Sequence, residues 1–138
     1  HGDLHWPLPL LTPWGIRREV RRSVSAVVAA AGVAPRFYRP PFGFMMPGQA
    51  AFVRRLGVEP VLGDVYPEDP HRPGTAVIVE RVVTRLSGGS IVILHDGSPV
   101  GDPDRTQTIE ALDPILEHAP GAGLRSVTLS ALPEGVDP

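Results

Sequence analysis

The sequence predicts an α/β fold with a parallel sheet, and three observations support this prediction. The 138 residues suit a single domain. Segments of strand character alternate with segments of helical character, which is the pattern of βαβ units. Residues 90–94 form a continuous apolar run, which is typical of a strand buried on both faces of a parallel sheet.

The first elements follow from proline, glycine and apolar spacing. Residues 6–15 are rich in proline and are predicted to form a loop. Residues 16–31 are predicted to form a helix that Gly32 ends, because apolar side chains recur there at helical spacing. The apolar side chains of this stripe are Ile16, Val20, Val24, Val27 and Val28. A short strand is expected at 36–39, ended by the diproline at 40–41.

The middle of the chain predicts a second helix and strand. Residues 49–56 lie between Pro47 and Gly57, which are natural start and stop signals for a helix. Residues 58–62 are expected to be a short strand, followed by a polar loop over 63–73.

The last third repeats the alternation. Helices are predicted over 75–86 and 104–118, and strands over 90–94 and 125–129. Four apolar residues of the last helix are expected to face the core: Ile109, Leu112, Ile115 and Leu116.

Composition excludes several classes of protein. The net charge of −2 gives no polybasic field for nucleic acid, and no apolar run approaches the length of a membrane span. The absence of cysteine excludes disulfides and thiolate metal sites. Four arginines do cluster, and we interpret them as the solvated face of a helix: Arg17, Arg18, Arg21 and Arg22.

Two histidines, His1 and His5, open the chain at a spacing of four residues. On a helix, this spacing places both imidazoles on one face, where they could bind a divalent metal such as zinc. The alternative is a pair of unrelated surface histidines. A zinc site also needs three or four protein ligands, so the pair alone would be incomplete.

Polar residues collect where the predicted strands end. Arg39 and the diproline follow one strand, Asp64 and Asp69 lie in the loop after another, and His95 follows the apolar run. Active sites of barrel-like α/β enzymes lie at these carboxyl ends. Each residue alone could instead serve a turn or a helix cap.

These motifs, in this order, resemble the NodB-homology polysaccharide deacetylases, carbohydrate esterase family four. The matching stretches are HGDLH at 1–5, RPPFG at 39–43, DVYPEDP at 64–70 and ILHDG at 93–97. The resemblance spans nearly the whole chain. It implies a distorted (β/α) barrel and metal-dependent hydrolysis of acetyl groups on a glycan.

The resemblance also implies roles for individual residues. His1 and His5 would be metal ligands, with zinc as the expected divalent metal. The backbone N–H of Phe42 would stabilise an oxyanion, and Arg39 would orient a catalytic aspartate. The neighbouring Pro41 would contact the substrate.

The remaining implied roles belong to the last two motifs. His95 would be the general acid that protonates the leaving amine, and Asp69 would hold and tune it. Leu94 would line the pocket for the acetyl methyl group.

The chain departs from the family pattern at one major point. The Asp-Asp motif that supplies the general base and the third metal ligand is absent from residues 1–138. We therefore expect residues 1–138 to be the C-terminal major part of one catalytic domain, a barrel without its first βα unit. An upstream segment of the same gene product would complete the site, and the 138 residues alone would have little or no activity.

Two smaller departures concern aromatic positions. Phe42 stands where the family commonly has tyrosine, and Pro70 follows Asp69 where many members have tryptophan. Because of the departure at Pro70, the sequence leaves open whether Asp69 or Asp64 is the partner of His95.

The leading hypothesis is a deacetylase acting on an N-acetylglucosamine polymer such as peptidoglycan or chitin. The alternatives are a non-catalytic glycan-binding domain or pseudoenzyme, and a small-molecule amidohydrolase on the same fold. The resemblance favours a secreted or cell-envelope location, with a glycan as substrate and no nucleic-acid partner.

Overall fold

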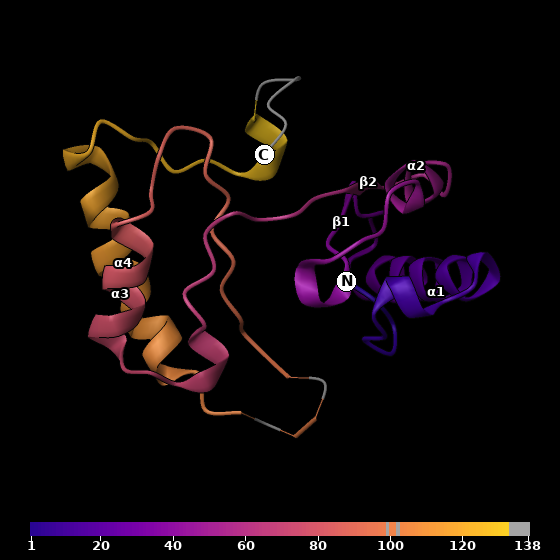
Figure 1. The fold of residues 1–138 in the computed structure, drawn as a ribbon, viewed down its shortest axis with the longest axis horizontal. Coiled ribbons are helices and arrows are strands. Elements are labelled where there is room, and N and C mark those ends of the chain that lie inside the picture. Colours follow the sequence, from indigo (N-terminus) through magenta and orange to yellow (C-terminus); the bar gives the residue numbers. More distant parts are fainter. Residues whose placement is uncertain (99, 102, 133–138) are drawn as a thin grey trace. The chain divides into compact units, whose positions relative to one another are not determined.

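The computed structural model describes residues 1–98, 100–101 and 103–132. The chain divides into two compact units, His1–Leu62 and Gly63–Pro138. Figure 1 shows the elements of each unit along the coloured ribbon. No helix in the described ranges is both long and apolar enough to cross a membrane.

The first unit contains two helices and two short strands. The elements are a 3-10 turn Leu8–Leu10, α1 Pro13–Ala31, β1 Phe37–Tyr38, a 3-10 turn Pro41–Gly43, α2 Gln49–Arg54 and β2 Glu59–Pro60. The strands pair in parallel, with Phe37 opposite Glu59 and Tyr38 opposite Pro60. Parallel pairing is confirmed, although each strand is shorter than the predicted 36–39 and 58–62.

Helix α1 begins and ends at recognisable caps. The Thr12 side chain accepts a hydrogen bond from the Gly15 N–H at 3.2 Å, and Pro13 occupies the first turn. Gly32 ends the helix in the left-handed conformation, with φ of 74°. All four arginines of the cluster are exposed, as expected for a solvated helix face.

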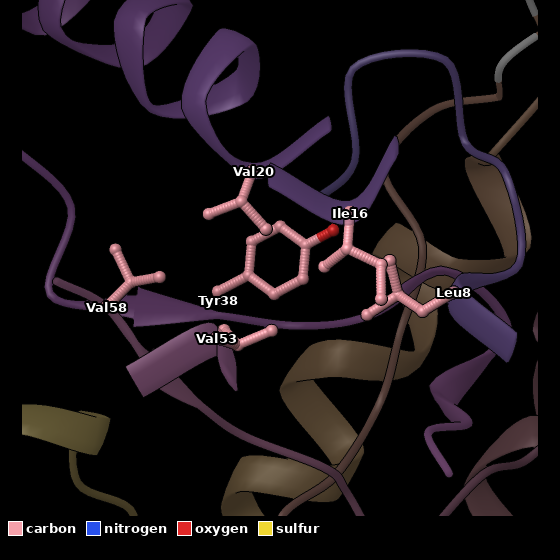
Figure 2. Packing of buried hydrophobic residues seen from close by; sticks show 6 residues of the cluster. All are labelled: Leu8, Ile16, Val20, Tyr38, Val53 and Val58. Atoms are coloured by element: carbon pink, nitrogen blue, oxygen red, sulfur yellow. The ribbon is translucent and has the colours of Figure 1, made fainter. Parts of the chain in front are cut away.

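The core of the first unit surrounds Tyr38. Figure 2 shows its ring between α1 side chains on one side and Val53 of α2 on the other. The buried members of this cluster are Leu8, Ile16, Val20, Tyr38, Val53 and Val58. Val27 and Val28, which were expected in the apolar stripe, are each 40% exposed. Because the cluster packs against the first half of α1, the core-facing stripe is shorter than predicted.

The second unit is built on two packed helices. Its elements are a 3-10 turn Asp69–His71, α3 Thr75–Val83, α4 Thr106–Gly121 and a 3-10 turn Leu129–Ala131. Its buried core comprises Val65, Ile78, Val82, Ala111 and Ile115.

The prediction of a fully buried strand at 90–94 is wrong. Only Val92 forms a bridge, a parallel one with Val65, and residues 90–94 are only partly buried. Gly63 allows this close approach, because a Cβ there would lie 2.7 Å from the carbonyl oxygen of Ile91. The segments at 63–65 and 91–93 thus lie side by side, and the residues that follow each of them leave from the same end.

Two further predictions for the second unit are corrected. The strand predicted at 125–129 does not form, because residues 125–128 have no regular structure and Leu129 begins a 3-10 turn. On α4, Ile109, Leu112 and Leu116 are exposed, and only Ile115 of the predicted face is buried. The buried stripe of α4 consists of Thr108, Ala111, Ile115 and Ala119. Three of these four have small or short side chains.

Candidate functional site

The two opening histidines lie together, but not on a helix. Residues 1–5 have no helical turn, and His5 has φ of 58° in the left-handed region. The two imidazole centroids are nevertheless 4.7 Å apart in an edge-on arrangement. The helical geometry expected from the spacing is therefore wrong, and an irregular turn brings the rings together instead.

The orientation of the His1 ring is fixed by the neighbouring motif. Its Nδ1–H donates to the backbone carbonyl of Arg39 at 2.7 Å, across 38 positions of sequence. This bond leaves Nε2 as the nitrogen with a free lone pair, which is the arrangement found around metal-binding histidines. The donor chemistry of the His1–His5 pair therefore fits a divalent metal such as zinc.

The pair is only part of a ligand set. No group of three or more His, Cys, Asp or Glu side chains that could hold a metal ion occurs within the described ranges. A zinc centre built on His1 and His5 needs at least one further protein ligand.

The loop after β1 carries Arg39 and the diproline. Pro40 and Pro41 are fully buried, whereas Phe42 is 69% exposed and has φ of 62°. A left-handed backbone is uncommon for a bulky residue and costs on the order of 1–3 kcal/mol, so the surrounding structure must hold it. The Phe42 ring lies edge-on to the His5 ring, with centroids 4.8 Å apart. The histidine turn and this loop therefore form one local arrangement in the first unit.

In the second unit, the structure places Asp69 beside His95. The Asp69 side chain is 1% exposed, and its Oδ1 accepts a hydrogen bond from His95 Nδ1 at 2.9 Å. Its Oδ2 accepts from the His95 backbone N–H at 2.9 Å and from the Thr108 hydroxyl at 3.0 Å. Both residues follow the parallel bridge between Val65 and Val92, which explains why they meet.

The geometry also decides between Asp64 and Asp69 as the partner of His95. Asp64 Oδ1 accepts from the Ile91 backbone N–H at 2.6 Å and ties the two parallel segments together. It forms no hydrogen bond with His95 in the described structure.

The environment of Asp69 favours its charged form. Burial by itself raises the pKa of this carboxyl group, but the hydrogen bonds from the His95 ring, the His95 backbone and Thr108 outweigh burial and hold the pKa below its usual range. With Asp69 ionised, the Nδ1 of His95 carries the proton, and the His95 Nε2 is the atom that can exchange a proton with a substrate.

This pKa shift predicts how stability depends on pH. A carboxyl group with a lowered pKa in the folded state contributes stability in full above its unfolded pKa of about 3.9. That contribution is lost as the pH falls through the folded-state pKa. We expect the free energy of unfolding, measured in urea at a series of pH values, to decrease below about pH 4.

Thr108→Val provides the matched variant for this measurement. It keeps the shape of the side chain but removes one bond to the Asp69 carboxylate, so its acid-dependent loss of stability should be smaller. An identical pH dependence in the two proteins would contradict the assignment.

Two residues that support the pair were not identified from sequence. Thr108 is 5% exposed, and Arg105 donates to the carbonyls of Pro70 at 3.3 Å and Gly97 at 2.9 Å. Arg105 thereby connects the segment after Asp69 to the segment after His95. The one available signal was the position of Thr108, a polar residue on the same helical stripe as Ala111 and Ile115.

The two residues expected to bind substrate remain predictions. Pro41 is fully buried, and Leu94 is partly buried and packs against the core of the second unit. His71 and His118 are exposed.

Comparisons with known proteins agree with the motifs. No family model matches the chain. It is 37% identical over 100 residues to a peptidoglycan-N-acetylglucosamine deacetylase from Bacillus cereus, covering 71% of this chain and 45% of that protein. It is 31% identical over 142 residues to a chitooligosaccharide deacetylase from a Bradyrhizobium species, covering 97% of this chain and 64% of that protein.

Solved structures give the same result. A family 4 carbohydrate esterase from Streptomyces lividans matches with a TM-score of 0.79 and 26% identity, over 94% of this chain and 63% of that one. A family 4 pseudoenzyme from Bacillus anthracis matches with a TM-score of 0.84 and 23% identity, over 96% of this chain and 44% of that one. The second likeness concerns the fold alone.

The chain spans about half of the first of these curated relatives and just under two thirds of the second. Within that span, the relatives, the fold and the four motifs agree. The chain belongs to the NodB-homology polysaccharide deacetylases, carbohydrate esterase family four.

Proposed function

We propose that the complete protein removes acetyl groups from a glycan, with an N-acetylglucosamine polymer such as peptidoglycan or chitin as the substrate. The observation that carries this proposal is the buried Asp69 carboxylate bonded to both the ring and the backbone of His95. A structural ion pair does not require this precise fixation of an imidazole, whereas a general acid does. Relatives named as peptidoglycan and chitooligosaccharide deacetylases support the choice of substrate class.

In this proposal the first unit provides the metal half of the site. His1 and His5 would hold a divalent cation, with zinc favoured by the imidazole donors. When bound, the cation supplies Lewis acidity toward the acetyl carbonyl. The backbone N–H of Phe42 would donate to the oxyanion that develops there, and Arg39 would orient the general base.

The second unit provides the acid half. The general base of the Asp-Asp segment would take a proton from water as the water oxygen adds to the acetyl carbon, the carbon–nitrogen bond would break, and the departing amine would take a proton from Nε2 of His95. Asp69 holds the His95 ring and backbone in place for that transfer. Family membership is what joins the two halves in one reaction. An Asp-Asp segment, as in the family, would supply the general base and the further metal ligand and would complete a distorted (β/α) barrel.

The fold alone does not establish catalysis, since a pseudoenzyme shares it. The test is acetate release by the complete gene product from chitooligosaccharides and from peptidoglycan, with and without a chelator. We expect chelator-sensitive release that His95→Gln abolishes. His118→Gln is the matched control, because His118 is an exposed helix residue, and it should leave the rate unchanged.

One result would contradict the proposed deacetylase activity. A folded, metal-loaded protein that binds these glycans without releasing acetate would contradict the proposal and favour a non-catalytic glycan-binding domain.

A further inference from the structure

Helix α1 contains one buried charge that neither the core nor the four motifs account for. Its four arginines are exposed, but Glu19, the single carboxylate of the helix, is 4% exposed. Burying a carboxylate costs several kcal/mol unless hydrogen bonds or a cation compensate. Glu19 forms no ion pair with any described residue.

The contacts of Glu19 lead to the histidine turn. Its Oε2 accepts a hydrogen bond from the Leu4 backbone N–H at 2.9 Å. The same oxygen lies against Gly2, where an added Cβ would be 3.0 Å away. Between His1 and His5, the carboxylate therefore bonds to the Leu4 backbone and leaves little room for a side chain at position 2.

Glu19 also influences its neighbour in the core. The Tyr38 hydroxyl is buried and has no hydrogen-bond partner in the described structure. Burial, and then the negative charge of Glu19, raise the pKa of this hydroxyl. An apolar side chain at this position would pack in the core without the cost of burying a carboxylate, which points to a role for Glu19 beyond packing.

The histidine turn needs such support. His5 has a left-handed backbone, and the turn lacks the repeating hydrogen bonds of a helix. The separation of two metal ligands must be held closely for a centre to form, and groups behind the ligands commonly provide this.

We propose that Glu19 is a positioning residue that sets the geometry of His1 and His5 by holding the Leu4 N–H from inside the core. This inference rests on the proposed metal-dependent function. It concerns the reach of the Glu19 oxygen to Leu4 and not the charge of Glu19.

Three substitutions separate reach from charge. Glu19→Gln keeps an oxygen at the same reach and removes the charge. Glu19→Asp keeps the charge but is one methylene shorter, so its oxygen falls short of Leu4. Glu19→Met has a similar length and no acceptor.

The measurement is the zinc dissociation constant of the complete gene product, by competition with a chromophoric chelator. We expect Glu19→Met to bind zinc about 10- to 100-fold more weakly, the usual effect of losing a group behind a metal ligand. Glu19→Asp should weaken binding on the order of tenfold, and Glu19→Gln should stay within about threefold of the parent. The visible spectrum of bound cobalt should change for Asp and remain unchanged for Gln.

Arg22→Gln is the matched control. Arg22 also connects α1 to the turn, through an ion pair with Asp3 at 2.7 Å in which the Arg22 side chain is 56% exposed and the Asp3 side chain 21%. Because the guanidinium end of this pair is open to solvent, we expect zinc affinity to change by less than about twofold.

The outcomes distinguish this inference from the proposed function. If Glu19→Gln binds zinc weakly while Glu19→Asp binds it tightly, the charge of Glu19 and not its reach supports the site, and the inference is wrong. Unchanged affinity in both Asp and Met variants would overturn any role for Glu19 while leaving the metal site intact. Failure of the parent protein itself to bind zinc would overturn the metal centre and this inference together. If Glu19→Met does not fold, the Glu19→Asp and Glu19→Gln variants still distinguish the reach of the side chain from its charge.

Discussion

Asp69→Asn is expected to lower kcat/KM for acetate release by about 10²- to 10⁴-fold. The carboxylate accepts hydrogen bonds at both oxygens, from the His95 ring on one side and from the His95 backbone and Thr108 on the other. An amide replaces one acceptor with a donor. Whichever way it is turned, an N–H group then faces another donor, and His95 loses either its tautomer or its position.

The control for this variant is Asp64→Asn. Asp64 lies five residues earlier and accepts a single bond from the Ile91 N–H through one oxygen, which an asparagine side chain can still provide. Its kcat/KM should stay within about threefold of the parent. Retention of more than a tenth of the activity by Asp69→Asn would show that the pair with His95 is structural.

Tyr38→Ala is expected to lower the free energy of unfolding by about 3–5 kcal/mol, the usual cost of removing an aromatic ring from a core. The Tyr38 side chain is 2% exposed and lies at the centre of the cluster formed by α1, α2 and β1. Urea denaturation followed by circular dichroism measures the change.

Tyr38→Phe separates the ring from the hydroxyl. The hydroxyl is buried without a partner in the described structure, so its removal should be neutral or slightly stabilising. A loss above about 1 kcal/mol would mean that the hydroxyl has a partner and that the account of the core is wrong.

The helices could be predicted from sequence because their signals are local. Gly32 ends α1 as expected, and the segments at 49–56 and 75–86 correspond to α2 and α3 with small differences at their ends. Helix α1 starts at Pro13 and not at residue 16, because the Thr12 cap and Pro13 lie within the stretch that was assigned to a loop. Thr12 and Pro13 are typical helix-start residues, but the many prolines around them favoured the prediction of a loop.

The strands and the core-facing side of α4 could not be predicted in the same way. A strand depends on a neighbour that bonds to its backbone, and an apolar run such as 90–94 does not specify that neighbour. Helix α4 has two adjacent stripes of side chains, and either of them could face the core. The larger apolar residues predict that one stripe faces the core, but the buried stripe is the one with Ala111 and Ala119, and Ala111 clusters with Ile78 and Val82 of α3.

The residues of the candidate site that lie in sequence motifs could be predicted, whereas those that depend on tertiary contacts could not. The motifs led to His1, His5, Asp69 and His95, and the structure pairs them two by two. Thr108 and Glu19 each make one hydrogen bond and Arg105 makes two, across 8 to 39 positions of sequence, and no local pattern predicts such bonds.

The two left-handed residues, His5 and Phe42, have a consequence for the evolution of this domain. Their rings are in contact, and each backbone adopts a conformation that glycine would adopt without strain. Glycine at position 42 would relax the backbone but remove the ring packed against His5, and glycine at position 5 would relax the backbone but remove an imidazole of the histidine turn itself. Under the proposed metal-dependent function, a relaxed backbone and an intact histidine turn are therefore opposing demands at these two positions.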